Sequence, residues 1–185
     1  MKVLDHLEEW LITVLLAAGT IIVFVAVVHR YASGWPIPGV QDALIKLNTS
    51  WAQELTIYMF VWMAKFGAAY GVRTGIHVGV DILLGKLNPP WRDNMIVVGL
   101  LAGATFTGII GTLGSKFVYE LSHTSSVSEV LELPMWIVYL AMPLGSFLMS
   151  FRFLQVAWRF VKTGELPRHD QGHVEGIDEA AEGRA

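Results

Sequence analysis

The stretch WLITVLLAAGTIIVFVAVV, residues 10–28, establishes the class of this protein, because it runs for 19 residues without a charged side chain. An α-helix rises about 1.5 Å per residue, so such a stretch covers roughly 28 Å, close to the hydrocarbon thickness of a bilayer. Two more uncharged stretches span residues 94–115 and 133–151. A fourth, residues 51–70, is interrupted only by one glutamate and one lysine. The sequence therefore predicts an all-α integral membrane protein with four transmembrane helices.

The amino-acid composition excludes several classes of function. Of 185 residues, 54% are apolar and 16% are charged, whereas soluble domains carry about 25% charged residues. There is no cysteine, which excludes disulfides, thiolate catalysis and cysteine-ligated metals. The sequence has no glycine-rich phosphate loop, no nucleophile with a nearby base and no pair of buried carboxylates, and its basic residues cluster no more than membrane flanks require. We therefore expect neither an enzyme nor a bound cofactor or metal, and no nucleic-acid partner.

The orientation of the chain follows from its loops, because cytoplasmic loops carry an excess of Lys and Arg. With a cytoplasmic N-terminus, these residues are Lys2, Arg73, Lys86, Arg92, Arg152, Arg159, Lys162 and Arg168 inside, against Arg30, Lys46 and Lys116 outside. We therefore expect both termini in the cytoplasm. We also expect an uncleaved first helix, because Asp5, Glu8 and Glu9 precede its apolar run. The expected spans are about 10–30, 51–72, 94–115 and 133–152.

Shorter segments complete the expected organisation. The first outer loop has apolar residues at helical spacing between Val40 and Leu47, which indicates a small amphipathic helix on the outer membrane face or against a partner. A proline pair at 89 and 90 stops any helix that enters the inner loop. Residues 1–162 form the expected four-helix membrane domain. The polar, acidic tail at 163–185 has few large apolar residues, so we expect it to be disordered and cytoplasmic.

Glycines recur every fourth residue at 67, 71, 75 and 79, and would line one groove of a helix that runs that far. A second ladder of small residues follows in the third span, at Gly99, Gly103, Thr107, Gly111 and Ser115. Small residues at this spacing let two helix backbones approach closely within lipid. Two uses fit the spacing, internal packing of the four helices and docking of another membrane subunit, and the glycines alone do not distinguish them.

Charges accompany the first ladder. Arg73, His77 and Asp81 stand four residues apart in one stripe, which fits either an ordinary positive flank or contact with a partner's carboxylate or a lipid phosphate. Lys65 lies deeper, where a charge costs about 2.5–3.5 kcal/mol by insertion scales. Glu54 lies on nearly the same helix face but about 16 Å away along the axis, so the two cannot pair. We therefore expect Glu54 and Lys65 each to need a separate partner, and the chain not to work alone.

Two other functions remain open from the residues. Glu54 would suit the coupling acid of a small, autonomous, homo-oligomeric exporter or channel. His29 and His123 share the expected outer side, and a haem-bearing membrane anchor would use such a pair of axial ligands. Histidines at helix ends near a membrane interface are ordinary, so the haem-bearing anchor is the weaker alternative.

The segment from Ser50 to Leu83 resembles the signature region of the small membrane subunit, or Q subunit, of tripartite ATP-independent periplasmic (TRAP) transporters, the DctQ family. The matching residues are Glu54, Trp62, Gly67, Ala68, Ala69, Arg73, Gly75, His77 and Asp81. The last span is similar to the last helix of that family, with Pro134, Tyr139, Pro143 and Gly145 in the expected order. Lys65 departs from the pattern, since many members look apolar there.

The resemblance implies a small, non-catalytic subunit that braces the large TRAP membrane subunit in the bacterial inner membrane. A periplasmic substrate-binding protein would deliver an organic acid, with a C4-dicarboxylate favoured, for sodium-coupled uptake. The large subunit would hold the substrate and sodium sites and move in elevator fashion. Membrane phospholipid is a further expected partner. The residues expected at the interface with the partner subunit or lipid are Glu54, Trp62, Lys65, Gly67, Gly71, Arg73, Gly75, His77 and Asp81.

Overall fold

The computed structural model describes residues 2–35, 39–74 and 89–164. Several predicted features lie outside the described residues: the ladder and stripe positions Gly75, His77, Gly79 and Asp81, and the tail from residue 165 onward.

All regular structure in the described residues is helical, apart from one isolated bridge between Val127 and Pro134. The helices are α1 (Lys2–Ala32), α2 (Val40–Lys46), α3 (Ser50–Thr74), α5 (Pro89–Ser122), α6 (Met135–Tyr139) and α7 (Ala141–Thr163). Within the described ranges, four segments, with α6 and α7 forming one of them, are long and apolar enough to cross a membrane. The predicted fold class is therefore confirmed, and α2 occupies the place of the expected small helix.

Local sequence explains where the long helices begin, end and bend. α5 begins at Pro89, because a proline in the first helical turn needs no N–H partner and its φ is already near the helical value. α7 is followed by Gly164, whose φ of 70° favours glycine and whose N–H donates to the Phe160 carbonyl at 2.8 Å. Between α6 and α7, Pro143 has no N–H to donate to the Tyr139 carbonyl one turn earlier, which accounts for the interruption of the helix there.

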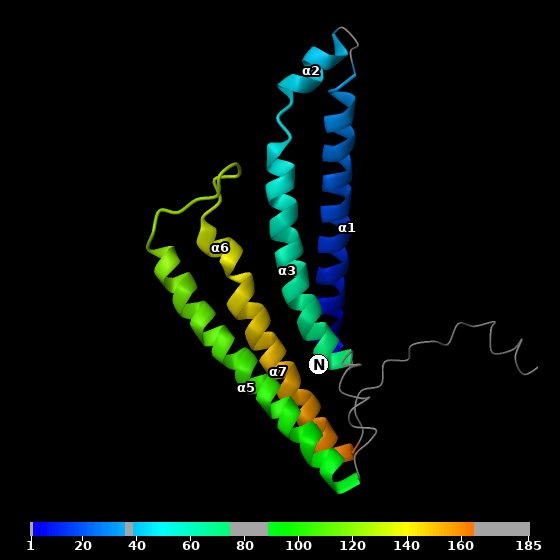
Figure 1. Cartoon of the computed structure of the whole chain (residues 1–185), viewed down its shortest axis with the longest axis vertical. Coiled ribbons are helices and arrows are strands. Elements are labelled where there is room, and N and C mark those ends of the chain that lie inside the picture. Colours follow the sequence, from blue (N-terminus) through cyan, green and yellow to red (C-terminus); the bar gives the residue numbers. More distant parts are fainter. Residues whose placement is uncertain (1, 36–38, 75–88, 165–185) are drawn as a thin grey trace, which may run out of the picture.

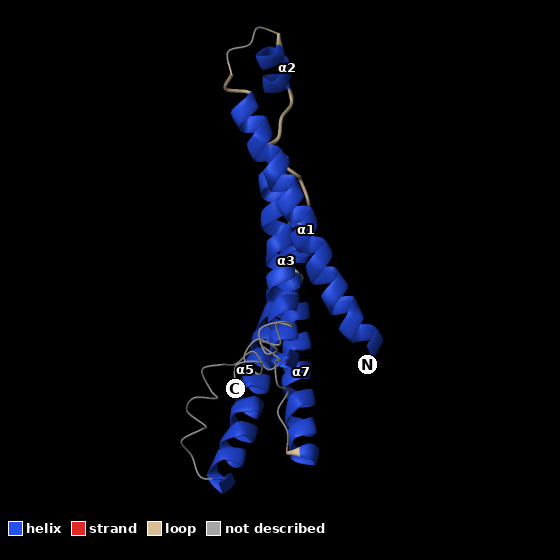
Figure 2. Ribbon diagram, turned by 90° about the vertical axis from the view of Figure 1, so that its right-hand side faces the viewer, coloured by secondary structure: helices blue, strands red, loops and turns tan. Residues whose placement is uncertain are grey.

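The four segments lie side by side in the order α1, α3, α7, α5 (Figure 1). α3 packs on α1 and α7, and α7 packs on α3 and α5, so α3 and α7 are the central helices. From the side, the helices overlap in a narrow band from which the N-terminal part of α1 leans out (Figure 2). The chain is thus an open layer of helices, and its outer helices α1 and α5 do not close it into a bundle.

The helix layer has two ends that carry different elements. The start of α1, the end of α3, the start of α5 and the end of α7 lie toward one end, which we call the terminal face (Figure 1). The opposite end carries α2 and the loop of residues 123–134, and we call it the loop face. The chain buries little of its own apolar surface: within the most apolar window of each span, the buried share of residues runs from 6% in α1 to 33% in α6–α7.

Candidate functional site

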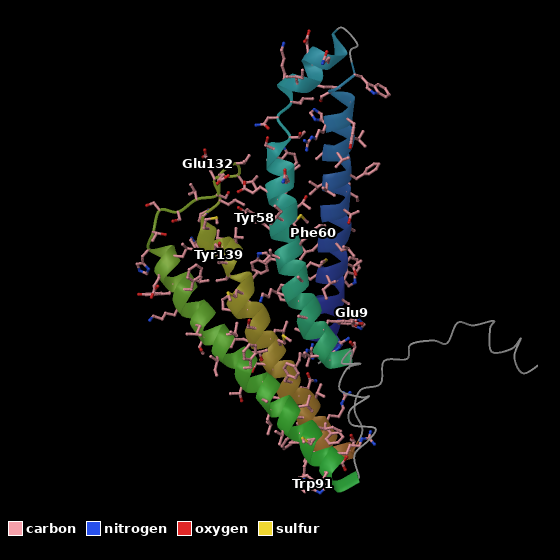
Figure 3. All side chains as sticks on the ribbon, viewed as in Figure 1. Glu9, Tyr58, Phe60, Trp91, Glu132 and Tyr139 are labelled. Atoms are coloured by element: carbon pink, nitrogen blue, oxygen red, sulfur yellow. The ribbon has the colours of Figure 1, made fainter. Side chains whose placement is uncertain are left out.

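Glu54, near the start of α3, is bound by its own chain on the loop face. The Tyr58 hydroxyl, one helical turn further on, donates to Glu54 Oε1 at 2.6 Å. The backbone N–H of Glu129 donates to the same oxygen at 3.2 Å, while those of Val130 and Leu131 donate to Oε2 at 3.1 and 2.8 Å. Both carboxylate oxygens are therefore engaged, and Figure 3 shows Tyr58 on the α3 side that faces α6.

The loop that supplies these N–H groups has a defined shape. The Ser128 N–H donates to the Leu133 carbonyl at 2.9 Å, and the Leu133 N–H donates to Ser128 Oγ at 3.1 Å. The Met135 N–H closes the base of the loop on the Ser126 carbonyl at 3.0 Å. Glu132 turns the chain with a φ of 53°, uncommon for a residue other than glycine. Three successive N–H groups thereby converge on one anion, in the manner of a backbone nest.

The expectation that Glu54 needs a partner from outside the chain is therefore wrong. That expectation considered only basic side chains as partners, whereas backbone N–H groups also neutralise a carboxylate. Since the loop joins α5 to α6, its bonds to Glu54 also tie α3 to the α5–α7 pair at the loop face.

His29, at the end of α1, is likewise occupied within the chain. Its Nε2 lies 3.0 Å from the Leu44 carbonyl of α2, and its Nδ1 lies 3.3 Å from Thr49 Oγ1. A neutral ring that donates from Nε2 and accepts at Nδ1 fits both contacts. Both nitrogens are then engaged, which weighs against His29 as an axial haem ligand. The described residues also contain no cluster of three or more His, Asp or Glu side chains suited to a metal ion.

At the terminal face, a buried ion pair joins α1 to α7. The Arg152 guanidinium donates from Nε and Nη2 to Glu8 Oε1 at 3.1 and 2.8 Å, and from Nη1 to Gln155 Oε1 at 2.8 Å. The side chains of Arg152 and Glu8 are only 1% and 2% exposed. The sequence places Arg152 in an ordinary basic flank, and the structure places it instead in a buried ion pair with Glu8 of α1.

A second ion pair joins α1 to α3 beside the first. Arg73 Nη2 donates to Glu9 Oε1 at 2.6 Å, and the guanidinium lies over the Tyr70 ring, 4.9 Å from its centroid. Arg73 therefore has a carboxylate partner on α1. Glu8 and Glu9 were missed as site residues. One signal existed: two adjacent acids directly precede an apolar run at the end of the spans where basic residues cluster, so basic side chains are available there as ion-pair partners.

Lys65 marks the crossing of the two central helices. A Cβ built on Gly145 of α7 would lie 2.6 Å from the Cβ of Lys65 and 3.3 Å from its backbone, so only glycine fits at 145. The side chain of Lys65 is half-buried, and it takes part in none of the ion pairs found among the described residues. Its need for a partner stays a prediction.

The two glycine ladders have different surroundings. On α5, a Cβ at Gly103 would lie 3.0 Å from the Phe153 ring, and one at Gly111 would lie 2.9 Å from the Phe147 ring, so these glycines receive aromatic side chains of α7. On α3, a Cβ at Gly67 or Gly71 would meet nothing within 4 Å.

Trp62, the remaining described interface candidate, lies on α3. It is half-buried, and its ring stacks on that of Phe66 at a centroid distance of 5.9 Å.

Comparison with known protein families and curated proteins identifies the chain. A family model described as "Tripartite ATP-independent periplasmic transporters, DctQ component" matches residues 19–163. The chain belongs to this family. The resemblance read from the sequence is thus confirmed, and the chain is a small permease subunit of a TRAP transporter. It is a multi-pass protein of the inner membrane from a family that is not enzymatic.

Curated relatives extend the match over nearly the whole chain. The chain is 52% identical to the C4-dicarboxylate TRAP transporter small permease protein DctQ of Rhodobacter capsulatus, covering 99% of this chain and 88% of that protein. It is 32% identical to the protein of the same name from Vibrio cholerae, covering 91% and 77% of the two chains. The Pseudomonas aeruginosa protein of that name is 30% identical, with 87% and 85% covered.

Proposed function

We propose that this DctQ-family subunit braces the large membrane subunit of a TRAP transporter during sodium-coupled, binding-protein-dependent uptake of a C4-dicarboxylate. The substrate class is supported by the name of the Rhodobacter capsulatus relative at 52% identity. The excess of basic residues at the terminal face supports a cytoplasmic position for that face. The loop face then lies in the periplasm, where it forms part of the surface that the binding protein meets.

The bracing role is supported above all by the contacts that the polar side chains of the spans make within the chain. Glu54, Glu8 and Arg152 all bind groups on other helices or on the α5–α6 loop, so they hold the helix layer together. A carrier needs substrate and ion sites near the midplane, often on interrupted helices. Within the described residues these acids and the buried arginine are already engaged, which suits a static element.

The proposed contacts with the large subunit or with phospholipid lie on two sides of α3, with Gly67 and Gly71 on one side and Lys65 on another, because residues two apart on an α-helix point about 200° apart. Lys65 places a positive charge within the span, and the two glycines lower the helix surface enough for close approach of another helix. Trp62 lies one turn before Phe66 on the same helix and belongs to this proposal. Arg73, Gly75, His77 and Asp81 would extend the contact toward the cytoplasm.

Reconstitution tests the proposed function. Proteoliposomes containing this chain and the large subunit, supplied with binding protein, a labelled C4-dicarboxylate and an inward sodium gradient, are expected to take up substrate only when all components are present. Uptake by this chain alone would contradict the proposal and favour an autonomous carrier. Uptake that does not depend on sodium would contradict the proposed sodium coupling.

Assembly is tested by co-purification. Lys65→Glu reverses the charge on the proposed contact and is expected to lower recovery of the large subunit at least several-fold. Lys116→Glu is the matched control, because Lys116 is 76% exposed and close to the loop-face end of α5. Equal recovery with both variants would argue against the α3 contact.

A further inference from the structure

We propose that Glu54 is a positioning residue: its carboxylate holds the loop of residues 126–134 in one shape against α3. This inference rests on the proposed function in one respect only, the assignment of the loop face to the side where the binding protein arrives. It differs from the interpretation of Glu54 as a coupling acid, because the carboxylate would affect transport only through the conformation of the loop.

The first support is the number and direction of the bonds. Four donors reach the two oxygens of Glu54, three of them consecutive backbone N–H groups from a loop 75–77 residues further along the chain. Hydrogen bonds to a charged acceptor are about twice as strong as those between neutral groups. Without the carboxylate, those three N–H groups lose their acceptor together.

The second support is that the loop does not hold itself by local bonds alone. Its internal hydrogen bonds join the two arms of the loop, and they involve Ser126, Ser128, Leu133 and Met135. The N–H groups at the tip of the loop donate instead to Glu54. The tip also contains Glu132 at a positive φ, a backbone conformation that surrounding contacts must maintain. Apolar side chains such as Val127, 55% exposed, stand on the outside of a loop so held.

The third support is the place of Glu54 in the helix layer. Its bonds connect α3 to the α5–α7 pair at the loop face, while the Glu8–Arg152 pair connects α1 to α7 toward the terminal face. Glu54 lies near the start of α3, whereas Arg152 lies midway along α7, so the two ties are at different depths of the helix layer. A loop fixed in this way keeps a constant position relative to the rest of the subunit, as a surface presented to a partner requires.

Amide hydrogen exchange of the purified chain tests the positioning directly. In Glu54→Gln, which keeps the length of the side chain but removes its charge and one acceptor oxygen, exchange at residues 129–131 is expected to speed up about 10-fold or more. Glu129→Gln is the matched control, because the side chain of Glu129 is exposed and only its N–H contacts Glu54. Exchange in α2, on the other outer loop, should not change in either variant.

Should Glu54→Gln fail to fold, Tyr58→Phe removes one of the four donors and should raise exchange at 129–131 by a smaller factor. Unchanged exchange at 129–131 in whichever variant folds would overturn the proposal.

Uptake measurements then separate positioning from a purely structural role. With the assembled transporter in proteoliposomes, Glu54→Gln is expected to raise the half-saturating concentration of binding protein several-fold and to change the maximal rate less than 2-fold. Loss of maximal rate with unchanged loop exchange would make Glu54 a coupling acid and overturn the proposal. Faster loop exchange with an unchanged half-saturating concentration would overturn it as well, since the loop would then be held for stability only. Uptake that needs no binding protein would instead refute the proposed function, while the exchange result would stand.

Discussion

α3 and α5 both carry small residues at every fourth position, yet the two ladders are used in opposite ways. Phe147 and Phe153 of α7 pack against the α5 ladder at Gly111 and Gly103, whereas nothing in the described chain approaches Gly67 or Gly71 of α3. The same spacing thus serves internal packing at Gly103 and Gly111 of α5 and leaves an open surface at Gly67 and Gly71 of α3. Spacing alone shows that close approach is possible, and the large side chains on neighbouring helices show where it happens.

The difference between the internal and the open glycines can be tested by substitution. Substitutions at internal contacts should affect the isolated chain, and substitutions on the open face of α3 should act only when a partner is present. The expected loss of stability of the isolated chain decreases from the buried ion pair, through the internal glycines, to the open glycines.

The largest loss is expected for Arg152→Met, which leaves Glu8 buried without its cationic partner. Breaking a buried ion pair from one side costs about 3–5 kcal/mol. Thermal unfolding of the detergent-solubilised chain, followed by tryptophan fluorescence, measures it. Arg159→Met, at an exposed position of the same helix, is the control. The double variant Glu8→Met/Arg152→Met should recover much of the loss, and a failure to recover would mean that the charges are not the cause.

A smaller loss is expected for Gly145→Ala, because the new methyl group would meet the Cβ and backbone of Lys65, which cannot swing aside. Such overpacking costs about 1–3 kcal/mol. Gly67→Ala adds the same methyl group to open space and should keep or slightly raise stability, since alanine favours helix. Equal melting temperatures for the two variants would contradict the distinction between internal and open glycines.

The next smaller loss of stability is expected within the small-residue ladder of α5. Gly111→Ala would press on the Phe147 ring at 2.9 Å, but that ring is 43% exposed and can shift outward, so we expect a loss of about 1 kcal/mol. Gly99→Ala, three turns earlier on α5, meets nothing within 4 Å and should cost nothing. Chemical or thermal unfolding of both variants checks the pair, and a larger loss at Gly99 would reverse the assignment.

The smallest effect on the isolated chain is expected for Gly71→Leu, within about 0.5 kcal/mol of the unmodified protein. Its effect should appear in assembly, as reduced co-purification with the large membrane subunit. Gly99→Leu, an equally large change at another open glycine, is the control for general effects of size. Recovery of the large subunit unchanged by Gly71→Leu would show that this part of α3 faces lipid.

The features predicted correctly from the sequence are those with local causes. The number of spans follows from the length of uncharged runs. The small helix α2 follows from the spacing of apolar residues between Val40 and Leu47. Each of these depends on residues within a few turns of one another, which a sequence displays directly. The proline pair at 89 and 90 was expected only to stop a helix, whereas α5 begins at Pro89.

The contacts between helices were not predictable in the same way. Glu8 and Arg152 are 144 residues apart, and the local sequence around either residue does not indicate its partner. Glu54 was harder still, because three of its four donors are backbone N–H groups, which every residue except proline supplies. No residue type marks such a partner, so an acid within a span looked unpaired when it was not.

The contact between Lys65 and Gly145 has a consequence for variation within the family. α7 meets residue 65 through the Cβ and backbone, atoms that all residues except glycine possess. The atoms beyond that carbon can change in length or charge while the central crossing keeps its geometry, whereas even a methyl group at position 145 overpacks the crossing. The geometry of the central crossing therefore depends on the absence of a side chain at position 145 and not on the identity of the side chain at position 65.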